Sequence, residues 1–168
     1  MGFFMCGDEM NWTFAKPELT HWLDLTQICF PDEDLSTLIT ALHAESDDVV
    51  VLMAQANGAW VAMGCLTQCQ VSGKAVSLLG PIGVHPDYQG QGLGRNLVEK
   101  LMESAASPVL VLGDPAFYGR FGFQAEQEIK PPYAIPKEWA SAWQSVGCQN
   151  LSGVLEVPTP WQVPAYWA

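Results

Sequence analysis

Charged residues are scarce in this sequence, and basic ones scarcest of all. They make up 15% of the 168 residues, with 18 Asp and Glu against 7 Lys and Arg, which gives a formal net charge of −11. Because such a surface repels nucleic-acid phosphates, we expect no DNA or RNA partner. The charge favours cationic partners such as amines, while a second interpretation of equal weight is that it serves solubility alone.

Cysteines are few and odd in number, and long apolar runs are absent. The five cysteines contain no Cys-x-x-Cys pair, so we expect neither a disulfide framework nor a metal site, and we expect a reducing, cytoplasmic location. Cys65 and Cys69 are predicted to be small core residues on one face of a strand. No apolar stretch reaches 18 residues and the N-terminus has no basic start, so we expect no membrane partner.

Hydrophobic residues are plentiful and typical of a globular protein. They form 49% of the chain, with seven Trp and seven Phe. A chain of this length buries roughly two thirds of its unfolded surface. We therefore expect a single domain over residues 1–168, in which residues 1–9 form a flexible or edge-covering tail.

The order of the expected elements indicates an α/β (α+β) fold. A strand at 11–14 is followed by a helix from Pro17 to about residue 30, with Ile28 on its inner face, and by a second helix over residues 35–42, capped by Asp32 or Asp34. Strands at 49–55, 59–70 and 75–84 alternate with Asn57-Gly58 and Ser72-Gly73 turns, which predicts an antiparallel meander.

A crossover completes the expected sheet. The helix predicted from residue 92 to 106 leads back to a strand at Val109, parallel to the last strand of the meander. Residues 131–136 contain three prolines and form no regular element. Residues 137–145 are predicted to form a helix that stacks Trp139 on Trp143, and residues 151–157 a last strand. The result is a mixed, mostly antiparallel sheet of six or seven strands flanked by helices.

A glycine-rich turn joins the strand ending at Val84 to the following helix. Its sequence from Gln89 is Gln-Gly-Gln-Gly-Leu-Gly-Arg. Glycines let the backbone approach a ligand closely, and the start of a helix favours negative charge, so this turn predicts a phosphate or pyrophosphate site. It is not a P-loop, because no Gly-Lys-Ser/Thr triplet follows, and the glycine spacing differs from the dinucleotide fingerprint.

A second segment strengthens this interpretation. Residues 109–123 are predicted to form a buried strand, a short helix carrying Tyr118, and the start of another strand at Gly122-Phe123. Two patterns in the chain resemble the two cofactor motifs of the GNAT superfamily of N-acetyltransferases: Gln-x-x-Gly-x-Gly after Val-x-Pro, and Tyr followed by Gly-Phe. The sequence of residues 112–123 is similar to that of the YhbS-like subgroup of this superfamily. The resemblance covers residues 10–160. Many members carry Asn and Ala where this chain has Val111 and Asp114, so no pantetheine contact is assigned there.

The resemblance implies acetyl-CoA (coenzyme A) as cofactor. Two parallel strands would splay apart at Val84 and Leu112, and pantetheine would fill the slot, with Gly83 at a place where a bulge forms easily. Backbone groups would hold the pantetheine and the pyrophosphate, and either of two arginines would approach a phosphate, unless it forms a surface ion pair. The implied cofactor-binding residues are Ile82, Gly83, Val84, Gln89, Gly90, Gln91, Gly92, Leu93, Gly94, Arg95, Phe117 and Arg120.

The resemblance also implies the catalytic role of Tyr118, whose hydroxyl would protonate the departing thiolate; the alternative is a ring that only packs on the cofactor. The Val84 N–H would stabilise the oxyanion. The sequence does not identify the general base. Phe30, Glu33 and Asp34 mark the expected acceptor site, although the two carboxylates also suit a helix cap. Histidine is a common general base, but the position of His85 beside Pro86 suggests an exposed residue instead. His21 and His43 are interpreted as residues without a catalytic role.

Three functions are compatible with these motifs. The first is an acetyl-CoA-dependent N-acetyltransferase that acts by direct transfer on a primary amine of a small molecule, peptide or protein, as a monomer or homodimer. The second is a non-catalytic acyl-CoA-binding or sensing module. The third, a nucleotide-binding protein, is disfavoured because its motifs do not match.

Overall fold

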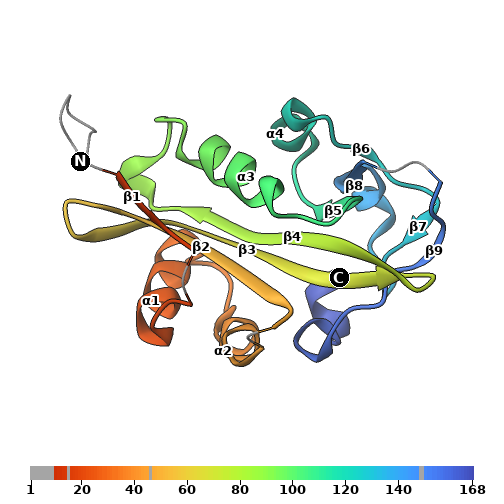
Figure 1. Ribbon diagram of the computed structural model, residues 1–168, viewed down its shortest axis with the longest axis horizontal. Coiled ribbons are helices and arrows are strands. Elements are labelled where there is room, and N and C mark those ends of the chain that lie inside the picture. Colours follow the sequence, from red (N-terminus) through yellow and green to blue (C-terminus); the bar gives the residue numbers. More distant parts are fainter. Residues whose placement is uncertain (1–9, 15, 46, 148–149) are drawn as a thin grey trace. The chain divides into compact units, whose positions relative to one another are not determined.

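The structure, a computed structural model, describes residues 10–14, 16–45, 47–147 and 150–168 (Figure 1). It has two compact units, residues 1–66 with 81–103 and residues 67–80 with 104–168. The predicted tail at 1–9, Cys6 and Cys148 lie outside the described residues. The single domain over residues 1–168 stays a prediction.

The main sheet has seven strands in the order β1-β2-β3-β4-β5-β8-β6. It is mixed and mostly antiparallel, so the predicted fold class is confirmed. Its strands are β1 (Met10–Thr13), β2 (Val49–Ala56), β3 (Ala59–Val71), β4 (Lys74–Val84), β5 (Val109–Leu112), β6 (Gln124–Ala125) and β8 (Trp143–Val146). A second sheet pairs β7 (Ile129–Lys130) in parallel with β9 (Gly153–Val154).

Both predicted hairpin turns are present. Asn57 and Gly58 have φ of 52° and 80°, and Ser72 and Gly73 have φ of 50° and 79°. Two successive residues with positive φ define a type I′ turn, which matches the twist of antiparallel strands. The two predicted turns of the meander are therefore confirmed.

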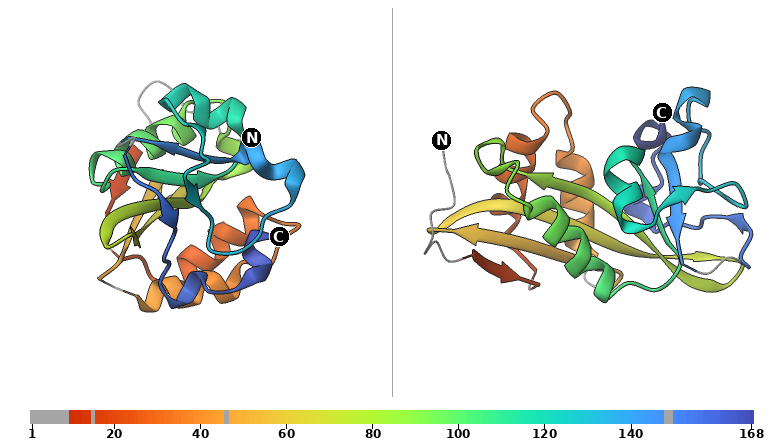
Figure 2. Two further views of the ribbon diagram at one scale, coloured as in Figure 1. Left: turned by 90° about the vertical axis from the view of Figure 1, so that its right-hand side faces the viewer. Right: turned by 90° about the horizontal axis from the view of Figure 1, so that it is seen from above.

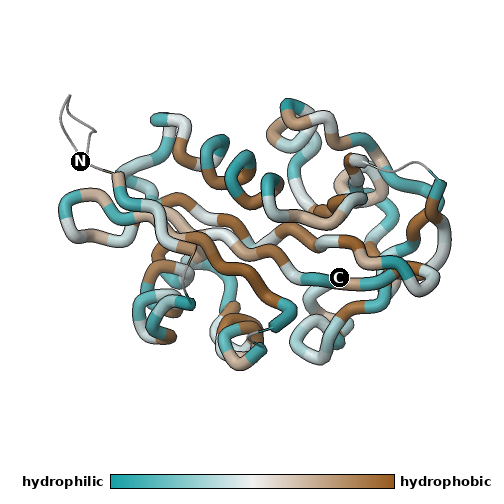
Figure 3. Tube along the Cα trace, in the orientation of Figure 1, coloured by the Kyte–Doolittle hydropathy of each residue, from teal (hydrophilic) through white to brown (hydrophobic). Residues whose placement is uncertain are grey.

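Helices cover both faces of the sheet in the first unit. The helices α1 (Leu19–Cys29) and α2 (Ser36–Ala44) lie on one face, and α3 (Leu93–Glu103) lies on the other (Figures 1 and 2). Figure 3 shows α3 hydrophobic toward the sheet and hydrophilic outside. A Cβ on Gly64 of β3 would lie 2.7 Å from Leu101 Cδ1, so this glycine lets α3 pack closely.

The inner face of α1 differs from the prediction at one position. Trp22, Leu25 and Thr26 are buried, whereas Ile28 is 44% exposed. The buried residues follow the i, i+3, i+4 pattern, and Ile28 lies roughly 240° around the helix from Trp22. Ile28 is therefore on the outer side, and the expectation of an inward side chain was wrong.

The second unit builds its part of the sheet around β5. This strand pairs in parallel with β4 through Ser77↔Val109 and Leu78↔Leu110 and antiparallel with β8, and β6 pairs antiparallel with β8. The short helix α4 (Pro115–Tyr118) follows β5 and carries Tyr118, as predicted.

The expected stacking of Trp139 on Trp143 was wrong. Residues 137–142 form a 3-10 turn that leaves Trp139 38% exposed, whereas Trp143 opens β8 and is buried. Its Nε1 donates to the Ile129 carbonyl at 2.8 Å, and its ring lies against that of Trp167. Pairing with the edge of β5 outweighs the helical spacing of the two tryptophans. The predicted last strand is also shorter, reduced to β9 and a bridge between Gln70 and Glu156.

Candidate active site

The glycine-rich turn has the backbone that its sequence predicts. After β4, a 3-10 turn at Pro86–Tyr88 leads into the loop, where Gly90 and Gly92 have φ of 78° and 81°. A Cβ added to either glycine would meet no atom within 4 Å. The backbone thus requires glycine for its conformation, and the space over the loop is open to a ligand.

The start of α3 supplies backbone donors beside these glycines. The Asn96 N–H donates to the Gly92 carbonyl at 3.0 Å, which closes the first helical turn. The N–H groups of Leu93, Gly94 and Arg95 precede that bond and have no acceptor within the helix, so they carry partial positive charge. Leu93 is 5% exposed and fixes this end of the helix in the core. An anion suits this arrangement.

Two side chains brace the loop. His85 Nδ1 accepts from the Asp87 N–H at 3.1 Å, and the ring packs edge-on against Tyr88. Gln89 Nε2 donates to the Val84 carbonyl at 3.2 Å. His85 therefore uses one ring nitrogen to cap the 3-10 turn, and Gln89 ties the loop back to the strand before it.

The two candidate phosphate-binding arginines are exposed. Arg95 Nε lies 3.1 Å from Glu99 Oε1, one helical turn on, and both side chains are more than half exposed. This is the surface ion pair that the sequence analysis left open as an alternative role, and it is formed by Nε of the Arg95 guanidinium. Arg120 lies on the 3-10 turn at Gly119–Phe121.

The hydrogen bonds of β4 change sides between Ser77 and His85. The Ser77 N–H donates to Pro108 and the His85 N–H to Val61 of β3, although residues eight apart in a regular strand donate to the same side. Gly80, with φ of 124°, lies between them. We attribute this irregularity to Gly80, and a bulge at Gly83 stays a prediction. Since successive N–H groups alternate, that of Val84 faces away from β3.

Gly83 has a different role, that of close packing. A Cβ there would lie 2.7 Å from Cys29 Cβ and 3.2 Å from the Phe30 ring. Phe30, which was predicted to contact the acceptor, thus lies against β4, the strand that was predicted to contact pantetheine. Burial raises the pKa of the Cys29 thiol to about 11. Sequence reasoning missed Cys29, although a glycine inside a strand is a signal of such close approach.

The expected acceptor carboxylates lie between α1 and α2. Asp34 Oδ1 accepts from the Ser36 hydroxyl at 2.6 Å and the Ser36 N–H at 3.0 Å, which lowers the pKa of Asp34. Asp34 thus braces the turn before α2, whose N-cap residue is Leu35 rather than the predicted aspartate. Glu33 lines a pocket of about 210 Å³ together with residues of both helices, namely Leu23, Asp24, Thr26, Gln27, Leu35 and Ser36.

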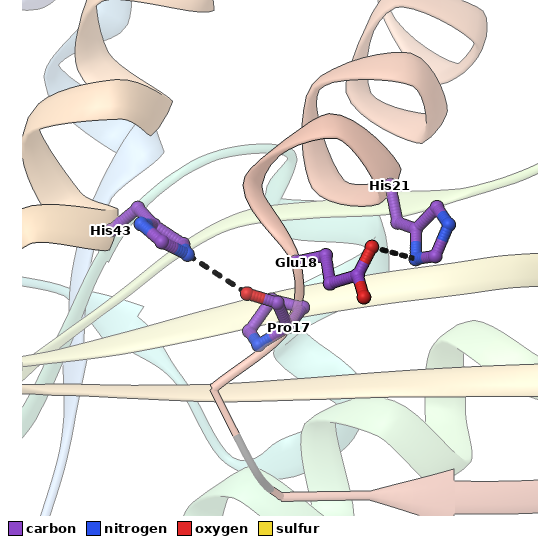
Figure 4. Close-up of polar contacts among 4 residues, drawn as sticks. All are labelled: Pro17, Glu18, His21 and His43. Atoms are coloured by element: carbon purple, nitrogen blue, oxygen red, sulfur yellow. Dashed lines mark hydrogen bonds and ion pairs between the residues drawn. The ribbon is translucent and has the colours of Figure 1, made fainter.

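The remaining two histidines contact the segment that starts α1. His43 Nε2 lies 2.8 Å from the Pro17 carbonyl oxygen, and His21 Nδ1 lies 3.9 Å from Glu18 Oε2 (Figure 4). The carbonyl only accepts, so Nε2 of His43 carries the proton in this contact. Both side chains thus contact the start of α1.

Tyr118 lies in the second unit, packed among aromatic rings. Its ring centroid is 4.9 Å from that of Phe117 and 5.6 Å from that of Phe123, and burial raises the pKa of Tyr118 to about 12. Asp114 accepts from the Ala116 N–H at 2.9 Å and caps α4. A phenol in this setting keeps its proton at neutral pH.

The comparisons with known proteins define the family. Residues 16–123 match the acetyltransferase (GNAT) family, to which this chain belongs. YjhQ, an uncharacterized N-acetyltransferase of Escherichia coli K12, is 32% identical over 114 residues, which are 60% of this chain and 63% of YjhQ. YhbS of the same strain is 46% identical over 50 residues, 27% of this chain and 30% of YhbS.

Solved structures establish the fold. YhbS from E. coli in complex with CoA aligns with a TM-score of 0.80 at 20% identity, covering 96% of this chain and 97% of YhbS. A GNAT acetyltransferase from Brucella melitensis with acetyl-CoA has a TM-score of 0.72 at 20% identity, covering 92% of this chain and 99% of its own. The predicted resemblance is confirmed.

The described residues contain neither a candidate membrane span nor a candidate metal-binding cluster. None of their helices is long and apolar enough to cross a membrane. Within the same residues, no three His, Cys, Asp or Glu side chains gather where they could hold a metal ion.

Proposed function

We propose that this chain transfers an acetyl group from acetyl-CoA directly to a primary amine of a small molecule, peptide or protein. The observation that carries the proposal is the loop at the start of α3, where Gly90 and Gly92 take positive φ beneath open space. Backbone donors at a helix start suit a pyrophosphate. Further support is that YhbS was crystallised with CoA and the Brucella relative with acetyl-CoA.

In this proposal the loop binds the pyrophosphate through its backbone. The N–H groups of residues 89–95 form the cradle. Arg120 is the remaining candidate for positive charge near the phosphates, because Arg95 pairs with Glu99. The backbone of residues 82–84 serves the pantetheine amides, as an added strand would. Phe117, on α4 beside Tyr118, completes the set of proposed contacts.

Acetyl-CoA supplies an acetyl group activated as a thioester, and the chain supplies two donors. The Val84 N–H faces away from β3 and is assigned to the thioester oxygen, where negative charge develops. The Tyr118 hydroxyl is assigned to the departing sulfur. The attacking amine must be neutral, so its ammonium proton leaves first and passes to a base or to solvent.

The acceptor is assigned to the end of α1 and the turn after it. Phe30 lies against Gly83, and Glu33 lines the pocket between α1 and α2. Carboxylates attract an ammonium group, and the net charge of −11 acts in the same direction. Asp34 contributes to this field while it accepts hydrogen bonds from Ser36. A cytoplasmic location and a monomeric or homodimeric state remain predictions.

A panel of amines tests the proposal. The purified chain is incubated with acetyl-CoA and small amines, peptides or lysine-bearing proteins, and free CoA thiol is followed with a thiol reagent. Protein without acetyl-CoA measures the reaction of the chain's own cysteines. We expect thiol release that depends on at least one amine. Binding of acetyl-CoA without turnover of any amine would instead identify a non-catalytic acyl-CoA-binding module.

A further inference from the structure

Gly113, which follows β5, lies against the ring of Tyr118. A Cβ on Gly113 would overlap Cε2 of that ring and lie 3.0 Å from its Cδ2. The φ of Gly113 is not positive, so its backbone suits any residue and only the neighbouring ring requires glycine. The missing side chain at position 113 therefore sets how closely the phenol approaches the backbone.

Both backbone groups of Gly113 are held by the segment that enters β8. Its N–H donates to the Ala142 carbonyl at 3.0 Å, which extends the β5–β8 ladder by one residue. Its carbonyl accepts from Gln144 Nε2 at 3.1 Å, and the same nitrogen lies 3.3 Å from the Ala142 carbonyl. Gln144 is 1% exposed, so a buried amide side chain is used to fix one backbone carbonyl.

The chain between Gly113 and Tyr118 is equally constrained. Asp114 caps α4 through the Ala116 N–H, and the Tyr118 N–H donates to the Asp114 carbonyl at 3.0 Å. Phe117 and Phe123 border the phenol ring with their own rings tilted by 79° and 70°. The ring thus packs against Gly113 and against two aromatic side chains.

We propose that Gly113 and Gln144 are positioning residues that fix the Tyr118 hydroxyl for proton transfer. The inference rests on the proposed function. In the step concerned, the C–S bond of the tetrahedral adduct and the Tyr118 O–H bond break as an S–H bond forms on the sulfur. The acetylated nitrogen releases its extra proton to water, and the phenolate takes one proton back from water, so the step is balanced. A donor displaced by about 1 Å loses about 10²-fold in rate, so a fixed ring has a direct kinetic value.

The test compares two glycine substitutions a few residues apart. Gly113→Ala adds a methyl group where the ring lies, whereas Gly119→Ala adds one where no atom lies within 4 Å, at a helical φ of −56°. With an amine from the panel, we expect Gly113→Ala to lower kcat by about 10²-fold. Gly119→Ala should leave kcat unchanged. Gln144→Met, which keeps the volume and removes both donors, should lower kcat by about 10-fold.

A second readout needs no substrate. In protein labelled with ¹³C in its tyrosine rings, the Tyr118 resonance is assigned by its loss in Tyr118→Phe. We expect Gly113→Ala and Gln144→Met to move this resonance and to leave those of Tyr133 and Tyr166 in place, because the ring shifts against Phe117 and Phe123. Unchanged resonances of Tyr133 and Tyr166 also show that each variant is folded.

The double variant separates this inference from the proposed function. If Gly113 acts through the hydroxyl, Gly113→Ala should cost little further activity once Tyr118→Phe is present. Normal kcat in Gly113→Ala with an inactive Tyr118→Phe would overturn the positioning role alone. An unmoved Tyr118 resonance in Gly113→Ala would do the same. Normal kcat in Tyr118→Phe would overturn the acid role, and the inference with it.

Discussion

The loop at residues 89–95 and the turn at residues 113–123 use glycine in opposite ways. In the loop, Gly90 and Gly92 have positive φ and open space above them, so the backbone itself is presented. In the turn, Gly113 has an ordinary backbone and a ring pressed on it, so a side chain, Tyr118, is presented. The first arrangement suits binding of an anion and the second suits placement of one functional group.

This difference predicts how each region fails. A backbone site is insensitive to most neighbouring side chains, but it fails when a residue cannot adopt the required φ. A packed side chain fails when its functional atom is removed or its support is changed. Substitutions in the loop should therefore weaken binding, whereas those in the turn should slow the reaction.

The largest effect is expected in the turn. Tyr118→Phe keeps the ring packing but removes the hydroxyl, so acetyl-CoA affinity should stay nearly constant while kcat falls by about 10²-fold. Steady-state kinetics and calorimetric binding measure the two quantities. Tyr118→Ala is the comparison, since loss of the ring should also weaken binding. Equal kcat for the wild type and Tyr118→Phe, with chemistry limiting the rate, would leave Tyr118 as a packing residue.

The next effect is expected in the loop. A β-branched residue at the φ of 81° of Gly92 is strained by about 1–3 kcal/mol, so Gly92→Val should lose most of the stabilisation that acetyl-CoA provides. Gly58→Val carries the same strain, at φ of 80° in the β2–β3 turn, and should keep that stabilisation. Thermal unfolding with and without acetyl-CoA measures both. If the two variants lose it equally, the loop has no special role.

A smaller effect tests Gly83, where glycine again serves packing. Gly83→Ala would place a methyl group 2.7 Å from Cys29 Cβ, and such overpacking costs about 1–3 kcal/mol. For a chain of this size the melting temperature should fall by about 2 to 12 °C. Gly119→Ala, with open space at the added methyl group, should melt like the wild type. An unchanged melting temperature of Gly83→Ala would show that α1 shifts at little cost.

The smallest effect concerns alkaline pH. Burial raises the pKa of Cys29 from 9.0 to about 11 and that of Tyr118 from 10.0 to about 12, so the folded state favours the protonated groups. The contribution of each group to stability is complete below its ordinary pKa, which applies to the unfolded chain. It is lost as pH rises through the raised pKa of the folded state. Melting temperatures of Cys29→Ala should therefore decline less between pH 9 and 11. A decline as steep as that of the wild type would contradict the burial of this thiol.

Local patterns predicted most of the fold. The two type I′ turns, the α3 periodicity and the crossover to β5 depend on neighbouring residues, and all were confirmed. The strand at Trp143–Val146 was missed because it forms by pairing with the edge of β5, a partner far away in the sequence. Ile28 was misplaced because its neighbours, rather than its own hydrophobicity, decide which face of α1 is buried.

For the candidate site, the sequence predicted the motifs but not the contacts that support them. The glycine loop and Tyr118 carry recognisable motifs, and the structure gives their expected elements. The supporting contacts, Cys29 against Gly83 and Gln144 on Gly113, join residues that are 54 and 31 positions apart. A glycine inside a strand signals a close approach, but it does not identify the partner. Packing partners of this kind emerge only when the chain is folded.

The most direct test of the central claim, that the loop takes acetyl-CoA, is thermal unfolding with a set of ligands. Acetyl-CoA at about 100 times its Kd should stabilise the chain by about 2.7 kcal/mol and raise its melting temperature by several degrees. NAD and ATP should raise it weakly or not at all, because the loop lacks their motifs. No shift at millimolar acetyl-CoA would contradict the account.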